Sequence, residues 1–366
     1  MTRSPEKTMY IDIHAHFTTV PDALKTWRDR QIEEIEQHGR HLSADGLDIS
    51  DEEIAAALTT GQLALQEQHG IDLALLSPIA GKMAHHYGDQ ETSLTWSRLS
   101  NDTVHRASVL FPDSFANVCQ LPQSPAGDID VCVEELRRCV TELGFVGCNL
   151  NPDHSDGYWQ APPITDRYYY PLYEAMVELG VPAMVHSSMS ANPAVHGTCA
   201  HYLNGDTTAF MQLCQSELFK DFPDLKLILP HGGGAVPYHW GRYQGVMQDQ
   251  GRGELLDIIG DNLYFDTCVY GAPGLQLLVD TVPAKNILFA SEMLGAVRGV
   301  DPASGHRYDD TRYLLDSLDF SDSSQRESIA AGNALEVFPR LRQRLEERGQ
   351  IPSTTGTPVG ATTAAN

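Results

Sequence analysis

Short apolar segments recur along this chain, and amphipathic stretches of helical period lie between most of them. Eight segments have the length of buried strands: Met9–Ile13, Leu73–Ser77, Phe115–Leu121, Phe145–Leu150, Pro182–His186, Leu225–Leu229, Leu263–Phe265 and Ile287–Ala290. Examples of the helical stretches are Glu134–Leu143, Tyr170–Leu179, Thr208–Lys220 and Gly274–Val279. Strands that alternate with helices in this way predict parallel βαβ units.

Two architectures are built from such units, the closed (β/α)8 barrel and the open doubly wound sheet. The nucleotide-binding form of the open sheet carries a glycine-rich phosphate-binding sequence after its first strand, and this chain has none there. We therefore expect an α/β fold, a TIM-like (β/α)8 barrel that spans residues 9–345 as one domain.

Residues 22–70 depart from the simple alternation of strands and helices. Asp22–Gln37 has the pattern of one charged amphipathic helix, and Ser50 opens a second helix whose first turn is acidic at Asp51–Glu53. We expect a helical insertion after the first strand, which either covers the mouth of the barrel or forms an extra helical layer. Residues 349–366 are rich in Thr, Pro, Gly and Ala without apolar periodicity, and they predict a disordered tail.

Composition narrows the kind of partner that the protein binds. The chain of 366 residues has 25 Lys and Arg against 49 Asp and Glu, a formal net charge of −24, and so offers no basic field for nucleic acid. Its sequence contains no apolar run as long as a membrane span and no apolar signal-peptide core in Met1–Met9. Seven scattered cysteines predict reduced, mostly buried thiols. We expect a cytoplasmic protein with a small-molecule ligand.

Polar residues that follow the apolar segments are the candidates for chemistry. His14 and His16 end the first segment, and residues i and i+2 of a strand point to one side. His186 ends the fifth segment, while His231 and Glu292 follow the sixth and the eighth. The pair at the first strand alone is equally compatible with polar histidines near a turn. Because the carboxyl ends of barrel strands share one face, the five together predict a site for Zn2+ or Mn2+.

A metal site of this kind can activate water or a substrate carbonyl group. A bound metal lowers the pKa of its water from about 16 towards roughly 7, or polarises a carbonyl group of the substrate. Glu292 could take or deliver the proton. No lysine follows a strand where a carbamylated bridge between two metals is expected, so we expect one metal. The three glycines after His231 predict a backbone that approaches a ligand closely.

These residues resemble the amidohydrolase superfamily, and within it the aminocarboxymuconate-semialdehyde decarboxylase-like branch. His14-Ala15-His16 matches the strand-one motif, and His186 and His231 match the histidines of strands five and six; Glu292 stands where the superfamily usually has Asp. Longer segments resemble the hydratases of that branch, and they are Met83–His86, Gly144–Asp153, His201–Asn204, Asp206–Phe210, His231–Arg242, Phe265–Tyr270 and Ala290–Gly299. The likeness extends from about Met9 to about Leu341.

The resemblance implies a β/α barrel with a bound zinc ion. It also implies addition of water across a conjugated C=C of a polycarboxylate from ring cleavage of protocatechuate or gallate, from 4-oxalomesaconate to 4-carboxy-4-hydroxy-2-oxoadipate. His14, His16 and His186 would bind the metal with Glu292 at or beside it, and His231 would be a ligand or an acid/base group. Relatives are commonly homo-oligomers, and we expect the same here.

Two other reactions need the same metal site. They are non-oxidative decarboxylation of an aromatic or muconate acid and hydrolytic C–C cleavage of a ring-fission product. A metal-stabilised barrel that only binds a ligand is the non-enzymatic alternative.

A substrate with several carboxylates needs cations in the cleft, and the planar fork of arginine suits them. Arg298 lies six residues after Glu292 and is our first candidate, and Arg242 is the second. Lys82 and His85 follow the second strand, and Asn151 follows the fourth and could donate to a substrate oxygen. For each of them the alternative is an ordinary surface salt bridge or a supporting hydrogen bond.

The chain departs from the hydratases of the branch at two places. Ile79 stands where an Arg follows the strand-two Ser-Pro, and Ser187–Ala194 stand where cysteines follow the strand-five histidine. His196 and Cys199 lie nearby and could substitute, with His196 as a substrate-binding candidate. Otherwise Cys199 is expected to be an ordinary buried thiol.

Overall fold

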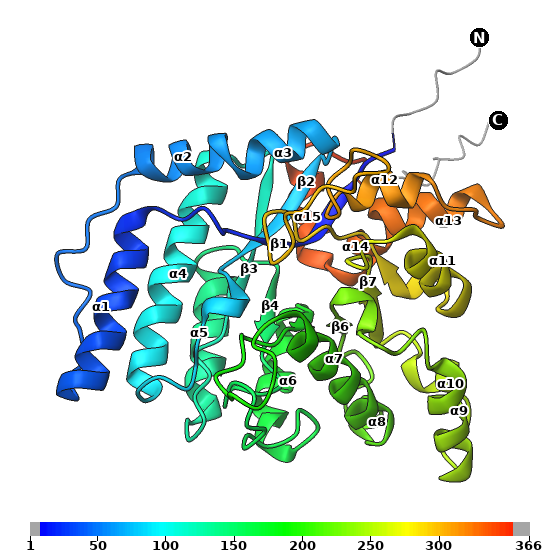
Figure 1. The fold of residues 1–366 in the computed structure, drawn as a ribbon, viewed down its shortest axis with the longest axis horizontal. Helices are drawn as coiled ribbons and strands as arrows, with labels where there is room; N and C mark the ends of the chain where they lie inside the picture. Colours follow the sequence, from blue (N-terminus) through cyan, green and yellow to red (C-terminus); the bar gives the residue numbers. More distant parts are fainter. Residues whose placement is uncertain (1–7, 354–366) are drawn as a thin grey trace, which may run out of the picture.

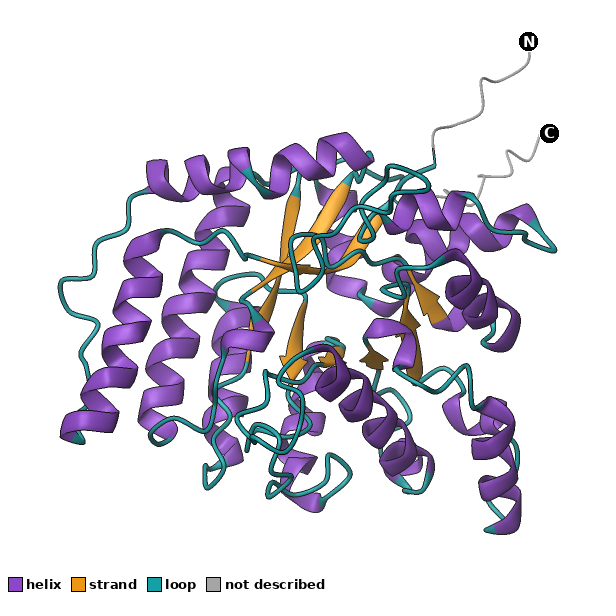
Figure 2. Cartoon of the chain, in the orientation of Figure 1, coloured by secondary structure: helices purple, strands orange, loops and turns teal. Residues whose placement is uncertain are grey.

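Eight parallel strands form the centre of the molecule, with helices around them (Figures 1 and 2), in a computed structural model that describes residues 8–353. The strands pair in sequence order, and they are β1 (Ile11–His16), β2 (Leu73–Ser77), β3 (Phe115–Gln120), β4 (Gly147–Leu150), β5 (Ala183–Val185), β6 (Leu227–Leu229), β7 (Leu263–Asp266) and β8 (Ile287–Leu288). Backbone hydrogen bonds from Ile13 N to Phe289 O (3.0 Å) and from Glu292 N to His14 O (2.8 Å) join the last strand to the first. The expected TIM-like barrel is confirmed, and all eight predicted strands are present.

Helices connect successive strands, and the last helices of the chain follow β8. They are α1 (Asp22–His38), α2 (Asp51–Thr60), α3 (Gln62–His69), α4 (Gln90–Leu110), α5 (Ile129–Thr141), α6 (Tyr170–Leu179), α7 (Cys199–Cys214), α8 (Leu218–Asp221), α9 (Trp240–Asp249), α10 (Leu255–Ile259), α11 (Ala272–Thr281), α12 (Thr311–Asp316), α13 (Ser323–Glu327), α14 (Asn333–Val337) and α15 (Pro339–Glu347). The single helix expected over Thr208–Lys220 is wrong. It is divided between α7 and α8, because the Ser216 hydroxyl accepts a hydrogen bond from Leu218 N (3.2 Å) and starts a new helix.

The interior of the barrel is apolar along most of its length and polar at one end. Ile11, Leu75, Val118 and Met184 belong to one apolar cluster inside the strands, which residues of α14 and α15 extend. Side chains alternate along a strand, so the row that contains Met184 continues inward at His186, directly after β5. The polar layer therefore lies at the carboxyl ends of the strands, where barrel enzymes place their active sites.

A bulge in β1 determines where its two histidines point. Ile13 belongs to the inner apolar cluster and Ala15 to the outer one, although residues two apart in a regular strand share a side. The pairing of β1 with β2 shifts register between Asp12 and Ala15. An extra residue in a bulge re-aims the side chains that follow it. As a result, His14 and His16 both face the inside of the barrel.

The helical insertion after β1 contains α1, α2 and α3. Ser50 caps α2 with a complete capping box, as its sequence predicts. In Figure 1, α1 runs beside α4, and the rings of Trp27 and Trp96 stack between them with centroids 6.3 Å apart. Arg28 Nη2 donates to Met83 O (2.7 Å), so α1 also supports the loop after β2.

The structure also tests the predictions for the cysteines and for a membrane span. All seven cysteines are free and six of them are buried, as expected. Cys199 is exposed, which corrects its assignment as a buried thiol, because it begins α7 at the molecular surface. Within residues 8–353, no helix is long and apolar enough to span a membrane. Most of the predicted tail, residues 354–366, lies outside the described residues.

Candidate active site

His14 and His16 meet at the polar end of the barrel with their Nε2 atoms 3.0 Å apart. His14 Nδ1 lies 2.8 Å from a carboxylate oxygen of Asp266, at the end of β7. His16 Nδ1 lies 2.8 Å from Ser77 Oγ and 3.2 Å from Pro78 O, at the end of β2. A carboxylate and a carbonyl oxygen only accept, so both Nδ1 atoms carry the hydrogen and both Nε2 atoms present lone pairs.

His186 adds a third lone pair to the same point. Its Nδ1 donates to Ser187 O (2.8 Å), and its Nε2 faces His16 Nε2 at 3.3 Å. Burial, with the neighbouring His14, holds the pKa of His16 and of His186 well below the usual value, so both rings are neutral. Ligand atoms of His14, His16, His186 and Glu292 all lie within 4.8 Å of one another, and all four residues are buried.

This arrangement fits a divalent cation. Three lone pairs that face one another at such distances repel unless a positive charge lies between them. Neutral imidazoles with one carboxylate are the donor set that Zn2+ and Mn2+ take in proteins. Asp266 orients the ring of His14 through Nδ1, as carboxylates commonly do for metal-binding histidines. Burial raises the pKa of that carboxyl group, but the hydrogen bonds that it accepts from His14 and from Gly232 N outweigh burial and lower it.

His231 lies beside these four residues rather than among them. Its Nδ1 is 2.9 Å from Asp206 on α7, and its Nε2 is 3.8 Å from Glu292. Burial opposes charge on the ring, yet Asp206 outweighs burial and raises the pKa of His231 to about 10. Tyr202, also on α7, stacks on the ring with centroids 5.6 Å apart. Nε2 is buried and has no hydrogen-bond partner among residues 8–353, so it is available to a ligand.

Glu292 sits in a tight turn directly after β8. The backbone of Glu292 is left-handed at φ +49°, and that of His231 at φ +53°. Residues other than glycine rarely adopt this conformation, and such strain collects at functional sites. Tyr270 donates to Glu292 Oε2 (2.9 Å). A Cβ on Gly295 would lie 2.9 Å from Glu292 Cδ, so only glycine leaves room for the carboxylate at this position.

The glycines after His231 have a packing role in the barrel. A Cβ on Gly233 would lie 2.5 Å from the Phe265 ring, and a Cβ on Gly234 would lie 2.4 Å from Leu203 O. These glycines let the backbone pack against β7 and α7. The expectation that this backbone also approaches a ligand stays a prediction.

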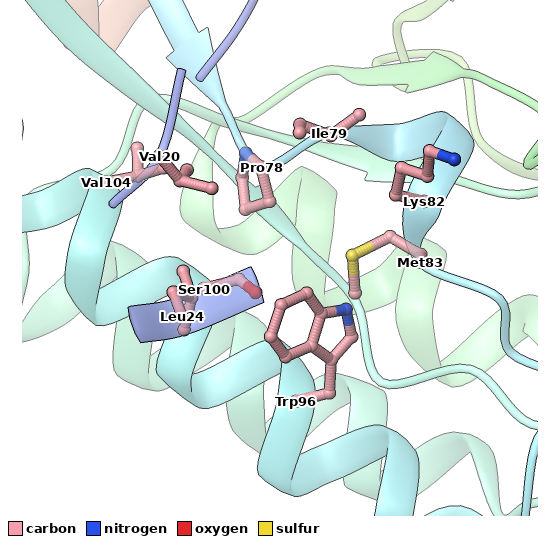
Figure 3. A pocket seen from close by; sticks show the side chains of 9 residues that line it. All are labelled: Val20, Leu24, Pro78, Ile79, Lys82, Met83, Trp96, Ser100 and Val104. Carbon is pink, nitrogen blue, oxygen red and sulfur yellow. The ribbon is translucent and has the colours of Figure 1, made fainter. Parts of the chain in front are cut away.

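The predicted cations lie outside the convergent residues. Arg298 is exposed, and its Nη2 donates to Leu294 O (3.1 Å), two residues after Glu292, which uses one of five donors. Arg242 is exposed on α9. Lys82 is exposed and borders an apolar pocket between α1, α4 and the loop after β2, with its amine turned away from Trp96 (Figure 3).

Of the other predicted substrate-binding residues, two are buried and one is exposed. His85 is buried and its Nδ1 lies 3.2 Å from Ser93 Oγ; burial lowers its pKa to about 3, so the ring is neutral. Asn151 is buried, and its Nδ2 donates to Ser188 Oγ (3.1 Å). His196 is exposed, and its Nδ1 accepts from Thr198 N (3.4 Å).

Four residues that touch the candidate site had no role assigned from the sequence. Asp266 directly follows a predicted strand, so the strand-end rule that found His186 finds it as well. Tyr270 follows in the same loop. Tyr202 and Asp206 share one face of α7 at a spacing of four residues, and they meet the site only through tertiary packing.

A family model described as Amidohydrolase matches residues 11–340. The chain belongs to this family, and the superfamily resemblance found in the sequence is confirmed.

Two relatives are similar along nearly their whole length. A 2-keto-4-carboxy-3-hexenedioate hydratase from Sphingobium sp. is 50% identical over 93% of this chain and 99% of its own sequence. A crystal structure of 4-oxalomesaconate hydratase from Rhodopseudomonas palustris has a TM-score of 0.87 and 48% identity over 93% of this chain and 99% of that chain. A dihydroxybenzoic acid decarboxylase from Polaromonas sp., with bound manganese and the inhibitor 2-nitroresorcinol, has a TM-score of 0.66 at 23% identity over 92% and 99% of the two chains, and shares the fold.

Proposed function

We propose that this protein is a metal-dependent hydratase that adds water to the conjugated C=C of 4-oxalomesaconate and forms 4-carboxy-4-hydroxy-2-oxoadipate. The observation that carries the proposal is the convergence of three buried imidazoles and Glu292 beside the His231–Asp206 pair. The similarity to two hydratases at 50% and 48% identity supports the choice of reaction.

His14, His16 and His186 are the proposed metal ligands, with Glu292 at or beside the ion and His231 facing the substrate. One divalent ion is expected. We favour Zn2+, for which histidine and carboxylate ligands are usual, and Mn2+ is the alternative, because the structurally similar decarboxylase holds manganese. When bound, the ion supplies Lewis-acid stabilisation of negative charge on a substrate oxygen.

The protein residues supply two proton transfers. Glu292 is the proposed base that takes a proton from water, so that the oxygen can bond to one carbon of the C=C. Negative charge then builds on the conjugated carbonyl oxygen. His231 holds a proton on Nε2 because Asp206 lies on the other side of its ring, and it is the proposed donor to the neighbouring carbon. The 3.8 Å between His231 Nε2 and Glu292 places acid and base beside one another.

The carboxylates of the substrate need partners at the mouth of the barrel. We propose Arg298 as the first, because its Nη2 donates to Leu294 O in the turn that carries Glu292 and a guanidinium has further donors for a carboxylate. Asn151 is the proposed amide donor, and Arg242, Lys82, His85 and His196 stay candidates of lower rank. A homo-oligomer and a cytoplasmic location stay predictions from the sequence.

Incubation of the metal-loaded protein with 4-oxalomesaconate tests the proposal. We expect loss of the conjugated ultraviolet absorbance and a product heavier than the substrate by one water, by mass spectrometry. Glu292→Gln should retain the fold and lose turnover. Glu134→Gln, the same change at an exposed position on α5, should retain it. A product that has lost CO2 or a split carbon chain would replace hydration by one of the other two reactions, and a wild type that binds without turnover would favour the non-enzymatic alternative.

A further inference from the structure

The loop after β7 is hydrogen-bonded to the segment that leads from β8 to Glu292. Thr267 Oγ1 donates to Ala290 O (2.8 Å) and accepts from Ala290 N (2.8 Å). Three residues further on, Tyr270 has a left-handed backbone at φ +61°. This conformation is costly for an aromatic residue and persists only where its surroundings impose it.

The strained backbone brings one hydroxyl group to Glu292. Tyr270 Oη lies 2.9 Å from Glu292 Oε2 and 3.0 Å from Ser291 O. Among the residues that the structure describes, Tyr270 is the one whose side chain donates a hydrogen bond to this carboxylate. The last torsion of a glutamate has a broad energy minimum, so rotamer preference alone does not orient its two oxygens.

We propose that Tyr270 is a positioning residue that fixes the carboxylate of Glu292 for the reaction, an inference that rests on the proposed function. Its hydroxyl holds Oε2 on the side that faces His231 Nε2, 3.8 Å away. The turn itself is held separately, because Asp309 accepts from Leu294 N (3.2 Å) and Glu292 N donates to His14 O (2.8 Å). Loss of the Tyr270 hydroxyl therefore frees the carboxylate and leaves the turn in place.

The same hydroxyl can hold Glu292 before and after it takes a proton. A tyrosine hydroxyl has one hydrogen, and here it has two acceptors. While Glu292 is a carboxylate, that hydrogen points to Oε2. Once Glu292 has received the proton from water, its new O–H donates to Tyr270 Oη, and the tyrosine hydrogen turns to Ser291 O. Each group then keeps a partner, and no proton leaves the pair.

Tyr270→Phe tests the inference, with Tyr264→Phe as its matched control. Tyr264 is on β7 and its hydroxyl donates to Asp261 O (2.8 Å), away from the candidate site. We expect kcat for hydration to fall about 10- to 100-fold in Tyr270→Phe, with KM and bound metal within about twofold of the wild type. Tyr264→Phe should change neither constant by more than about twofold. Unchanged kcat in Tyr270→Phe, an equal loss in Tyr264→Phe, or loss of the metal would each overturn the positioning role.

A second measurement does not depend on turnover. Crystal structures of the wild type and both variants report where Glu292 Oε2 lies relative to His231 Nε2. We expect the carboxylate to rotate away in Tyr270→Phe alone, and an unmoved carboxylate would contradict the inference. If the wild type fails to hydrate 4-oxalomesaconate, the proposed function fails, while the displaced carboxylate still decides the role of Tyr270.

Discussion

Two groups of three histidines lie in this barrel, and their ring nitrogens have different partners. The convergent histidines are His14, His16 and His186. The loop histidines are His85, His86 and His154 in the loops after β2 and β4.

In the first group every Nδ1 has an acceptor and the Nε2 atoms face one another at 3.0 and 3.3 Å. In the second group the rings meet protein side chains. His86 pairs with Asp156, His85 Nδ1 lies 3.2 Å from Ser93 Oγ, and His154 Nδ1 lies 3.3 Å from Gln123 Nε2.

The two groups differ in where their ring nitrogens point, and a metal site needs lone pairs that point to one place. Both groups lie at the carboxyl ends of strands, and both contain buried neutral rings. Burial lowers the pKa of His85 to about 3 and that of His154 to about 4. Only the convergent histidines direct lone pairs at a common point. Facing lone pairs, and not position after a strand, distinguish the candidate metal site.

The largest effect should come from removing one of the convergent histidines. His186→Ala deletes one proposed ligand and should lower both metal content and turnover, the latter by at least about 1000-fold. His154→Gln, in the loop group, should retain both. Metal analysis of the two purified variants beside a turnover assay measures this. Equal metal loss in the two variants would remove the distinction between the groups.

A smaller effect should follow from removing the charge of Asp206, the partner of His231. Asp206→Asn removes the negative charge that keeps this ring protonated, so kcat should fall by about 100-fold. Metal content should be unchanged, because His231 lies outside the convergent set. Steady-state kinetics with metal analysis checks both expectations. If the variant instead loses its metal, His231 is a ligand and the assignment of roles is wrong.

Asp266→Asn should weaken metal binding by about 10- to 100-fold, because Asp266 orients His14 through its Nδ1–H. Asp156→Asn is the matched change in the loop group, since Asp156 pairs with His86. It should leave the metal affinity unchanged. Competition with a chromogenic chelator measures both affinities, and equal values for the two variants would contradict the role of Asp266.

The smallest effect concerns the pH dependence of stability in the metal-free protein. The folded protein holds His85 neutral down to about pH 3, whereas the unfolded chain binds a proton near pH 6.5. The unfolded state therefore binds more protons between these values, and the free energy of unfolding falls as pH falls through that window, by about 1.4 kcal/mol per pH unit for one histidine. His85→Gln should flatten this fall. Urea unfolding at pH 6.5 and pH 4.5 measures the slope, and identical slopes would show that His85 is not the titrating group.

Much of the fold could be predicted because the signals are local. Eight apolar segments separated by helical stretches are enough to indicate a parallel barrel. The bulge in β1 could not be predicted, because it depends on the register between β1 and β2. Ala15 and Leu76 pair in space although they are 61 residues apart in sequence. Without that bulge the alternation inside β1 would turn His14 to the other side of the strand.

The candidate site also contains residues that a local sequence pattern locates and residues that it does not. His186, His231 and Glu292 follow strands, so a local rule locates them. Asp206 approaches His231 from α7, and its contact depends on how that helix packs, which the local pattern does not contain. The rule that polar residues after strands are candidates also selected His85. This rule describes the place of a residue in the chain and not the direction of its lone pairs.

Anomalous diffraction from crystals grown with zinc locates the metal, with data collected on both sides of the zinc absorption edge. We expect one peak, about 2.0–2.2 Å from Nε2 of His14, His16 and His186 and at or beside a Glu292 oxygen. A peak among the loop histidines, or none at the convergent histidines, would contradict this expectation.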